Sequence, residues 1–166
     1  MIGVSDNWCN TPRMTTCDLL VIARWMLPIA PENCILHNHA VAITNGAIVD
    51  LGTAKDVQAR VSPNETVDLN DHIVLPGLVN AHGHAAMTLL RGAGEDQSLQ
   101  AWLSDTIWPL EAQHVNADFV RLGTEVALAE MIASGTTTFS DMYFFPPDCA
   151  DLVAHVGLRA QLCFSV

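Results

Sequence analysis

The pattern of apolar and polar positions changes character near residue 75. Before that point, short apolar runs are separated by residues typical of turns. The runs cover residues 19–22, 40–44, 47–51 and 66–69. Asn45-Gly46 joins two of them, and this dipeptide is a strong signal for a tight β-hairpin. We therefore expect a loose N-terminal arm over residues 1–16, followed by a small β-sandwich segment over residues 17–74.

After residue 75 the pattern alternates between strand and helix. Residues 73–79 are continuously apolar or nearly so, and the β-branched segment 136–139 and segment 158–166 also favour strands. Between them, Ser98 and Asn116 are placed to cap the N-termini of two helices, and residues 147–156 predict another. Pro109 is expected to end or kink the first helix. This order is typical of a parallel α/β sheet or barrel.

The length of this second part limits how much of a barrel it holds. A closed eight-stranded barrel takes about 250 residues. We expect residues 75–166 to form the N-terminal part of a (β/α)8 TIM barrel, with about three strands. The sequence then stops before such a barrel can close.

Charge and cysteine content narrow the class of protein. The 166 residues include 18 acidic and 7 basic side chains, for a net charge of −11. This balance argues against binding to nucleic acid or to an anionic membrane surface, which requires clustered lysine and arginine. The five cysteines form no C-x-x-C pair and suit a reducing compartment, so we expect a cytoplasmic protein.

The sequence His82-Gly83-His84 is the strongest candidate for chemistry. It follows the apolar run 73–79, and alternate side chains of a strand share one face. Both imidazoles would therefore converge at the end of the strand, where parallel barrels place their active sites. Two such histidines make half of a divalent-metal site. His37-Asn38-His39 has the same spacing but leads into the predicted hairpin, so we interpret that pair as surface histidines of a strand.

The segment from Leu75 to His84, with its pattern Pro-Gly-x-x-x-x-His-x-His, resembles the amidohydrolase superfamily. The likeness continues through residues 87–92, 102–103, 109–111 and 134–143, and is strongest to the branch of purine and nucleoside deaminases with the related triazine hydrolases. It implies a (β/α)8 barrel joined to a β-sandwich built from both chain ends. It also implies one divalent metal, usually zinc, held by His82 and His84. The remaining ligands and the proton-transferring Glu and His would come from later strands, outside this sequence. We therefore expect the chain to be an incomplete part of an enzyme and to be inactive by itself.

The resemblance implies hydrolytic deamination of an adenine nucleoside. In this reaction 5′-methylthioadenosine or S-adenosylhomocysteine would give the inosine analogue and ammonia. Glu111 is the implied substrate-binding residue, because a carboxylate can accept two hydrogen bonds from the vicinal ribose hydroxyls. From its residue type alone, Glu111 is interpreted as a solvated acidic side chain near a helix end. Asp141 is equally compatible with capping a loop and with a catalytic role.

Other functions remain open at this stage. One is a different amidohydrolase reaction, such as deamination of guanine or cytosine or dechlorination of a triazine. Another is a non-catalytic truncated homologue. The expected partners are a nucleoside substrate, the remaining part of the barrel as a separate segment or chain, and a second copy in a homo-oligomer.

Overall fold

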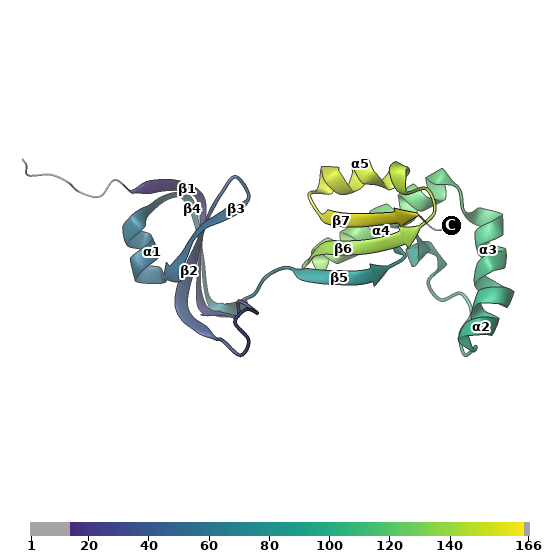
Figure 1. Ribbon diagram of the computed structural model, residues 1–166, viewed down its shortest axis with the longest axis horizontal. Helices are drawn as coiled ribbons and strands as arrows, with labels where there is room; N and C mark the ends of the chain where they lie inside the picture. The colour runs from purple at the N-terminus through teal and green to yellow at the C-terminus, as the bar shows by residue number, and fades with distance from the viewer. Residues whose placement is uncertain (1–13, 165–166) are drawn as a thin grey trace, which may run out of the picture. The chain divides into compact units, whose positions relative to one another are not determined.

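The computed structural model describes residues 14–164, which form two compact units divided between Pro76 and Gly77 (Figure 1). Most of the expected loose arm, residues 1–13, lies outside the described residues. The first strand already begins at Thr15, two residues before the predicted start of the strand-rich segment. None of the described helices has the length and apolar character needed to cross a membrane.

The first unit is a four-stranded sheet with one short helix. Its elements are β1 (Thr15–Met26), β2 (Leu36–Thr44), β3 (Ala47–Thr53), α1 (Ala54–Arg60) and β4 (Val61–Val74). The strand order is β3-β2-β1-β4, with β1 antiparallel to β2 and parallel to β4. Six buried residues form its core: Cys17, Leu20, Ala40, Ala42, Val57 and Val61.

The predicted hairpin at Asn45-Gly46 is present between β2 and β3. Asn45 and Gly46 have φ angles of 51° and 73°, the left-handed pair that a tight hairpin turn requires. The Asn45 amide also donates to the Asp18 carboxylate at 2.7 Å. The predicted sandwich segment is represented in residues 14–76 by one sheet, in which all four strands pair edge to edge. Val57 of α1 packs into its core.

The second unit alternates strands and helices as predicted. Its elements are β5 (Leu78–Gly83), the 3-10 helix η1 (Ala85–Leu90), α2 (Leu99–Ala101), the π-helical segment η2 (Trp102–Ile107), α3 (Trp108–His114), α4 (Ala117–Ala133), β6 (Thr136–Tyr143), α5 (Pro146–Val156) and β7 (Arg159–Phe164). The sheet order is β5-β6-β7, and both pairings are parallel. All three strands therefore end at the same edge, and α3 stands beyond that edge (Figure 1).

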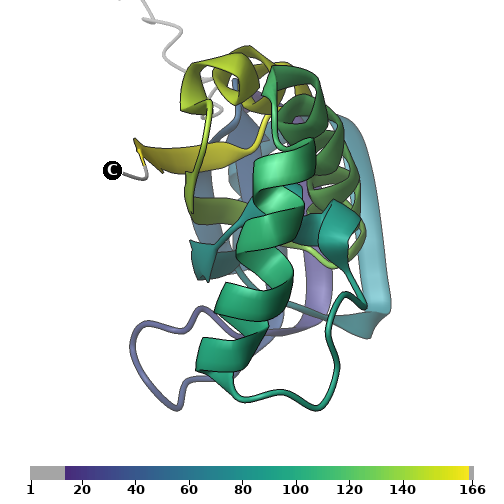
Figure 2. The same ribbon diagram turned by 90° about the vertical axis from the view of Figure 1, so that its right-hand side faces the viewer.

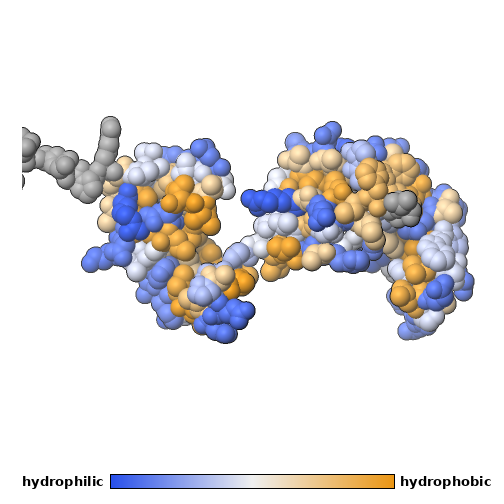
Figure 3. Space-filling model, viewed as in Figure 1, coloured by the Kyte–Doolittle hydropathy of each residue, from blue (hydrophilic) through white to orange (hydrophobic). Residues whose placement is uncertain are grey.

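Helices cover one face of this sheet. Phe139 of β6 is buried together with Leu128 of α4 and Leu152 of α5, in a core that lies between strands and helices. In Figure 1, α4 runs behind the strands. On the strands, Val79 and Phe164 remain 67% and 68% exposed. The sheet is thus open, with one apolar face packed and other apolar side chains uncovered, some of which are visible in Figure 3.

Of the two predicted effects of Pro109, an end or a kink, the helix does not end there but departs from regular α geometry. The chain stays helical from α2 through η2 to α3, and Figure 2 shows one continuous helix. The Trp108 amide bonds to the carbonyl of Leu103, five residues earlier, so a wider π turn precedes the proline. Pro109 follows in the first turn of α3. Proline has no backbone N–H, so the regular α-helical hydrogen-bond ladder is interrupted at this position although the chain remains helical.

The caps predicted from Ser98 and Asn116 are both present. Ser98 accepts a hydrogen bond from the amide of Ala101, and Asn116 accepts one from the amide of Phe119 at 2.9 Å. Helix α4, which Asn116 begins, lies against η1 at a very close backbone contact. A Cβ on Gly123 would meet the backbone of Ala86, so only glycine allows this approach. The contact holds the segment that directly follows His84.

Candidate functional site

The two histidines of the His-Gly-His motif meet at the carboxyl end of β5. Their ring centroids are 5.0 Å apart, and the rings are nearly perpendicular. His82 is exposed within the last residues of β5, and half-buried His84 precedes the first turn of η1. The predicted convergence of these side chains is therefore found. It is accompanied by a bulge that simple strand alternation does not predict, because β5 advances three residues from Asn80 to Gly83 while β6 advances two.

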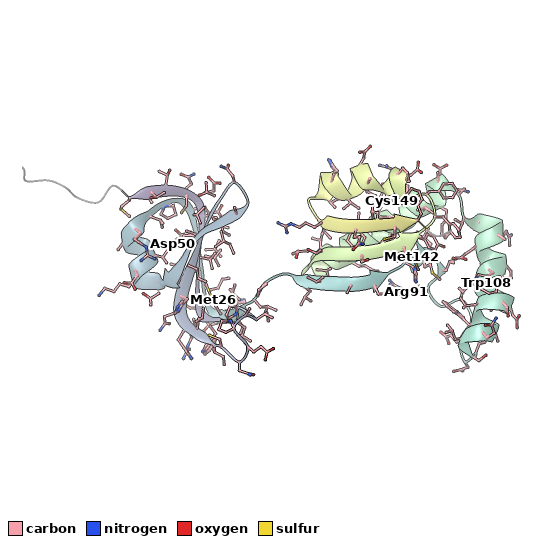
Figure 4. All side chains as sticks on the ribbon, viewed as in Figure 1. Met26, Asp50, Arg91, Trp108, Met142 and Cys149 are labelled. Carbon is pink, nitrogen blue, oxygen red and sulfur yellow. The ribbon has the colours of Figure 1, made fainter. Side chains whose placement is uncertain are left out.

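The ring of His84 is oriented by the neighbouring strand. Its Nδ1 lies 2.7 Å from the carbonyl oxygen of Met142. Met142, near the end of β6, is labelled in Figure 4. A carbonyl can only accept, so Nδ1 carries the proton and Nε2 keeps a free lone pair. This is the arrangement found in most metal-binding histidines, whose other ring nitrogen donates to a carbonyl or carboxylate.

The donor set fits part of a metal site. A neutral imidazole with a fixed tautomer is a good ligand for zinc. Within residues 14–164, however, no group of three or more His, Cys, Asp or Glu side chains converges. The described residues thus offer two imidazole ligands. A catalytic zinc site normally has three protein ligands, so at least one more is needed.

Asp141 fixes the chain immediately after His84. Its carboxylate is 7% exposed and accepts a hydrogen bond from the amide of Ala85 at 2.7 Å. Burial raises the pKa of Asp141, while the Ala85 amide and the nearby His84 act in the opposite direction. Of the two interpretations left open by the sequence, the structure supports capping. Asp141 caps the turn that follows the histidine pair.

Glu111 lies at the same end of the sheet as His84. It is half-buried on α3, and its Oε1 accepts a hydrogen bond from the hydroxyl of Tyr143 at 2.8 Å. Tyr143 is the last residue of β6, is 5% exposed, and has its ring centroid 6.4 Å from that of His84. Burial, followed by the hydrogen bond and charge of Glu111, raises the pKa of Tyr143 far above its ordinary value. Tyr143 therefore remains a neutral donor.

Two residues that contact the candidate site, Tyr143 and Met142, were not predicted from the sequence. Tyr143 lies inside the matched segment 134–143, but no role was predicted for it, and the Met142 carbonyl carries no side-chain signal. The predicted strand ended at residue 139, four residues before Tyr143, and only the structure shows that β6 extends to this residue. The other histidine pair, His37 and His39, lies in strand β2 as predicted, and His39 Nδ1 donates to the carbonyl of His37.

Comparison with known proteins identifies the family. The sequence model of the amidohydrolase family matches residues 73–166, which is more than half of the chain. Parallel strands with a histidine pair at their carboxyl end are present in the same segment. The chain belongs to the amidohydrolase family.

Two individual relatives are similar to this chain over most of its length. A 5-methylthioadenosine/S-adenosylhomocysteine deaminase of Saccharophagus degradans is 43% identical over 152 residues, covering 92% of this chain and 34% of that protein. An adenosine deaminase from Xanthomonas campestris, crystallised with bound zinc, superposes with a TM-score of 0.86 at 43% identity, over 89% of this chain and 34% of that one.

A more distant structure shares the fold alone. An atrazine chlorohydrolase from Arthrobacter aurescens, complexed with zinc, gives a TM-score of 0.74 at 20% identity, over 88% of this chain and 35% of that one. The chain thus spans about a third of the length of the relatives it matches.

Proposed function

We propose that this chain supplies the first metal-binding strand and a ribose contact of an enzyme that deaminates an adenine nucleoside by hydrolysis. The observation that carries the proposal is the histidine pair. His82 and His84 lie with ring centroids 5.0 Å apart, and the Met142 carbonyl leaves Nε2 of His84 free for a ligand. The relatives at 43% identity are named as deaminases of adenosine-type nucleosides, and one of them was crystallised with zinc.

In this proposal His82 and His84 hold a divalent metal, for which zinc is the first candidate. The chemistry that such a metal supplies in hydrolases is a water nucleophile available near neutral pH. His84 contributes a ring whose proton is held away from the metal by Met142. Glu111 binds the vicinal hydroxyls of the ribose and so orients the adenine ring. The products are the inosine analogue and ammonia.

The proposal includes a completing segment. Two imidazoles leave coordination positions unfilled, and a proton donor for the ring nitrogen is also needed. We assign these groups to further strands that complete a (β/α)8 barrel, in the same polypeptide or in a separate one, with a β-sandwich formed around the sheet of the first unit. The uncovered Val79 and Phe164 support this assignment, because apolar strand residues normally pack against further elements.

The test is turnover by a reconstituted enzyme. Here the chain is joined to the part of the Xanthomonas campestris deaminase that lies beyond the matched third. We expect release of ammonia from 5′-methylthioadenosine, S-adenosylhomocysteine or adenosine, and much less from guanine, cytosine or atrazine. Preferred turnover of a substrate without ribose would contradict the proposal. A folded, zinc-loaded protein with no turnover of any of them would favour a non-catalytic homologue.

A further inference from the structure

We propose that Tyr143 is a positioning residue for Glu111, holding one carboxylate oxygen so that the other is free for the substrate diol. The proposal rests on the proposed role of Glu111 in ribose binding. The contact that carries it is the hydrogen bond from the Tyr143 hydroxyl to Oε1 of Glu111, 2.8 Å long and partly buried. Within the described residues, Oε2 of Glu111 makes no hydrogen bond.

Tyr143 is fixed by its own packing and can therefore fix the orientation of Glu111. Its side chain is packed in a buried cluster with Ala86, Val120 and Cys149. Its ring also makes an edge contact with Phe144, with centroids 5.1 Å apart. A glutamate has three rotatable side-chain bonds, and fixing them before the substrate arrives removes an entropic penalty from binding. A buried phenol anchored in a strand is suited to do this.

The same strand end also orients His84. Met142 accepts from the His84 ring, and the next residue, Tyr143, donates to Glu111. Two consecutive residues of β6 thus fix one proposed metal ligand and the proposed ribose contact. The distance between metal and ribose subsites is set by one rigid element, which is how precise sites are usually supported.

The kinetic test uses Tyr143→Phe in the reconstituted enzyme. We expect a three- to tenfold rise in KM for adenosine, with kcat within about twofold, because one hydrogen bond to a charged group is lost. With 2′,3′-dideoxyadenosine, which lacks the diol, KM should not change. An equal rise for both substrates would mean that Tyr143 acts only through structure, and would overturn the proposal.

Two further variants separate the possible failures. Thr124→Val removes another buried hydroxyl, one that contacts Cys149 and has no contact with Glu111, and should leave the ribose dependence intact. Glu111→Gln should raise KM for adenosine selectively. If Glu111→Gln shows no ribose dependence, the proposed role of Glu111 fails. If it does and Tyr143→Phe does not, only the positioning role fails.

Discussion

The imidazole of His84 donates to the backbone carbonyl of Met142 at 2.7 Å, which ties the end of β5 to the end of β6. Strand β5 ends at Gly83, and the side chain of the next residue, His84, adds a further link between the two strands. The same contact selects the tautomer with a free Nε2. The pairing of β5 with β6 and the orientation of the proposed metal ligand therefore share one contact.

This relationship predicts that His84→Asn lowers the zinc affinity strongly and the stability only slightly. The asparagine amide can occupy the place of Nδ1 and keep the bond to Met142, but it has no group at the position of Nε2. We expect the free energy of unfolding to fall by less than about 1 kcal/mol. Zinc affinity of the reconstituted enzyme should fall by more than about 100-fold. Thermal denaturation and zinc titration measure the two effects.

A His84→Asn protein that binds zinc normally would contradict this account. His72→Asn serves as the matched control, since His72 is an exposed histidine of β4 in the first unit. It should change neither quantity.

Gly123→Ala should destabilise the second unit, although alanine is the better helix former. In an exposed helix interior this change stabilises by about 1 kcal/mol. Here the new Cβ would meet the Ala86 backbone, and Ala86 is fully buried. We expect a net loss of about 1–3 kcal/mol, typical of overpacking. Chemical denaturation measures it, and an increase in stability would show that η1 and α4 are not in close contact.

Asp141 should be more important as a hydrogen-bond acceptor than as a charge. Asp141→Ala leaves the Ala85 amide without its partner in a buried site, which costs about 1–3 kcal/mol. Asp141→Asn retains a carbonyl oxygen at the same place and should cost clearly less. Comparison of the two unfolding free energies tests the capping role. Equal losses would instead point to a need for the carboxylate charge.

Local signals in the sequence predicted most of the fold. Asn45-Gly46 predicted the hairpin, Asn116 the start of α4, and the alternation after residue 75 the parallel sheet. The sequence left open whether Pro109 ends or kinks its helix, because the π turn found before it depends on the geometry of the neighbouring helical turns. Strand spacing alone does not tell whether strands form one sheet or two, and the described residues of the first unit form one.

The sequence predicted residues of the candidate site only where the type of side chain indicates its role. The motif placed His82 and His84 together, and the structure brings their rings within 5.0 Å. The Met142 carbonyl and the bulge in β5 depend on strand register, which follows from pairing between residues far apart in sequence. The link between Tyr143 and Glu111 joins residues 32 positions apart and needed the folded chain to be seen.

The central claim, that His82 and His84 hold the metal, is tested most directly by native mass spectrometry of the reconstituted enzyme. Two double variants with the same spacing are compared: His82→Asn with His84→Asn, and His37→Asn with His39→Asn. We predict that the first loses bound zinc and that the second keeps it at the wild-type level. Zinc retained by the first variant, or lost only from the second, would contradict the account.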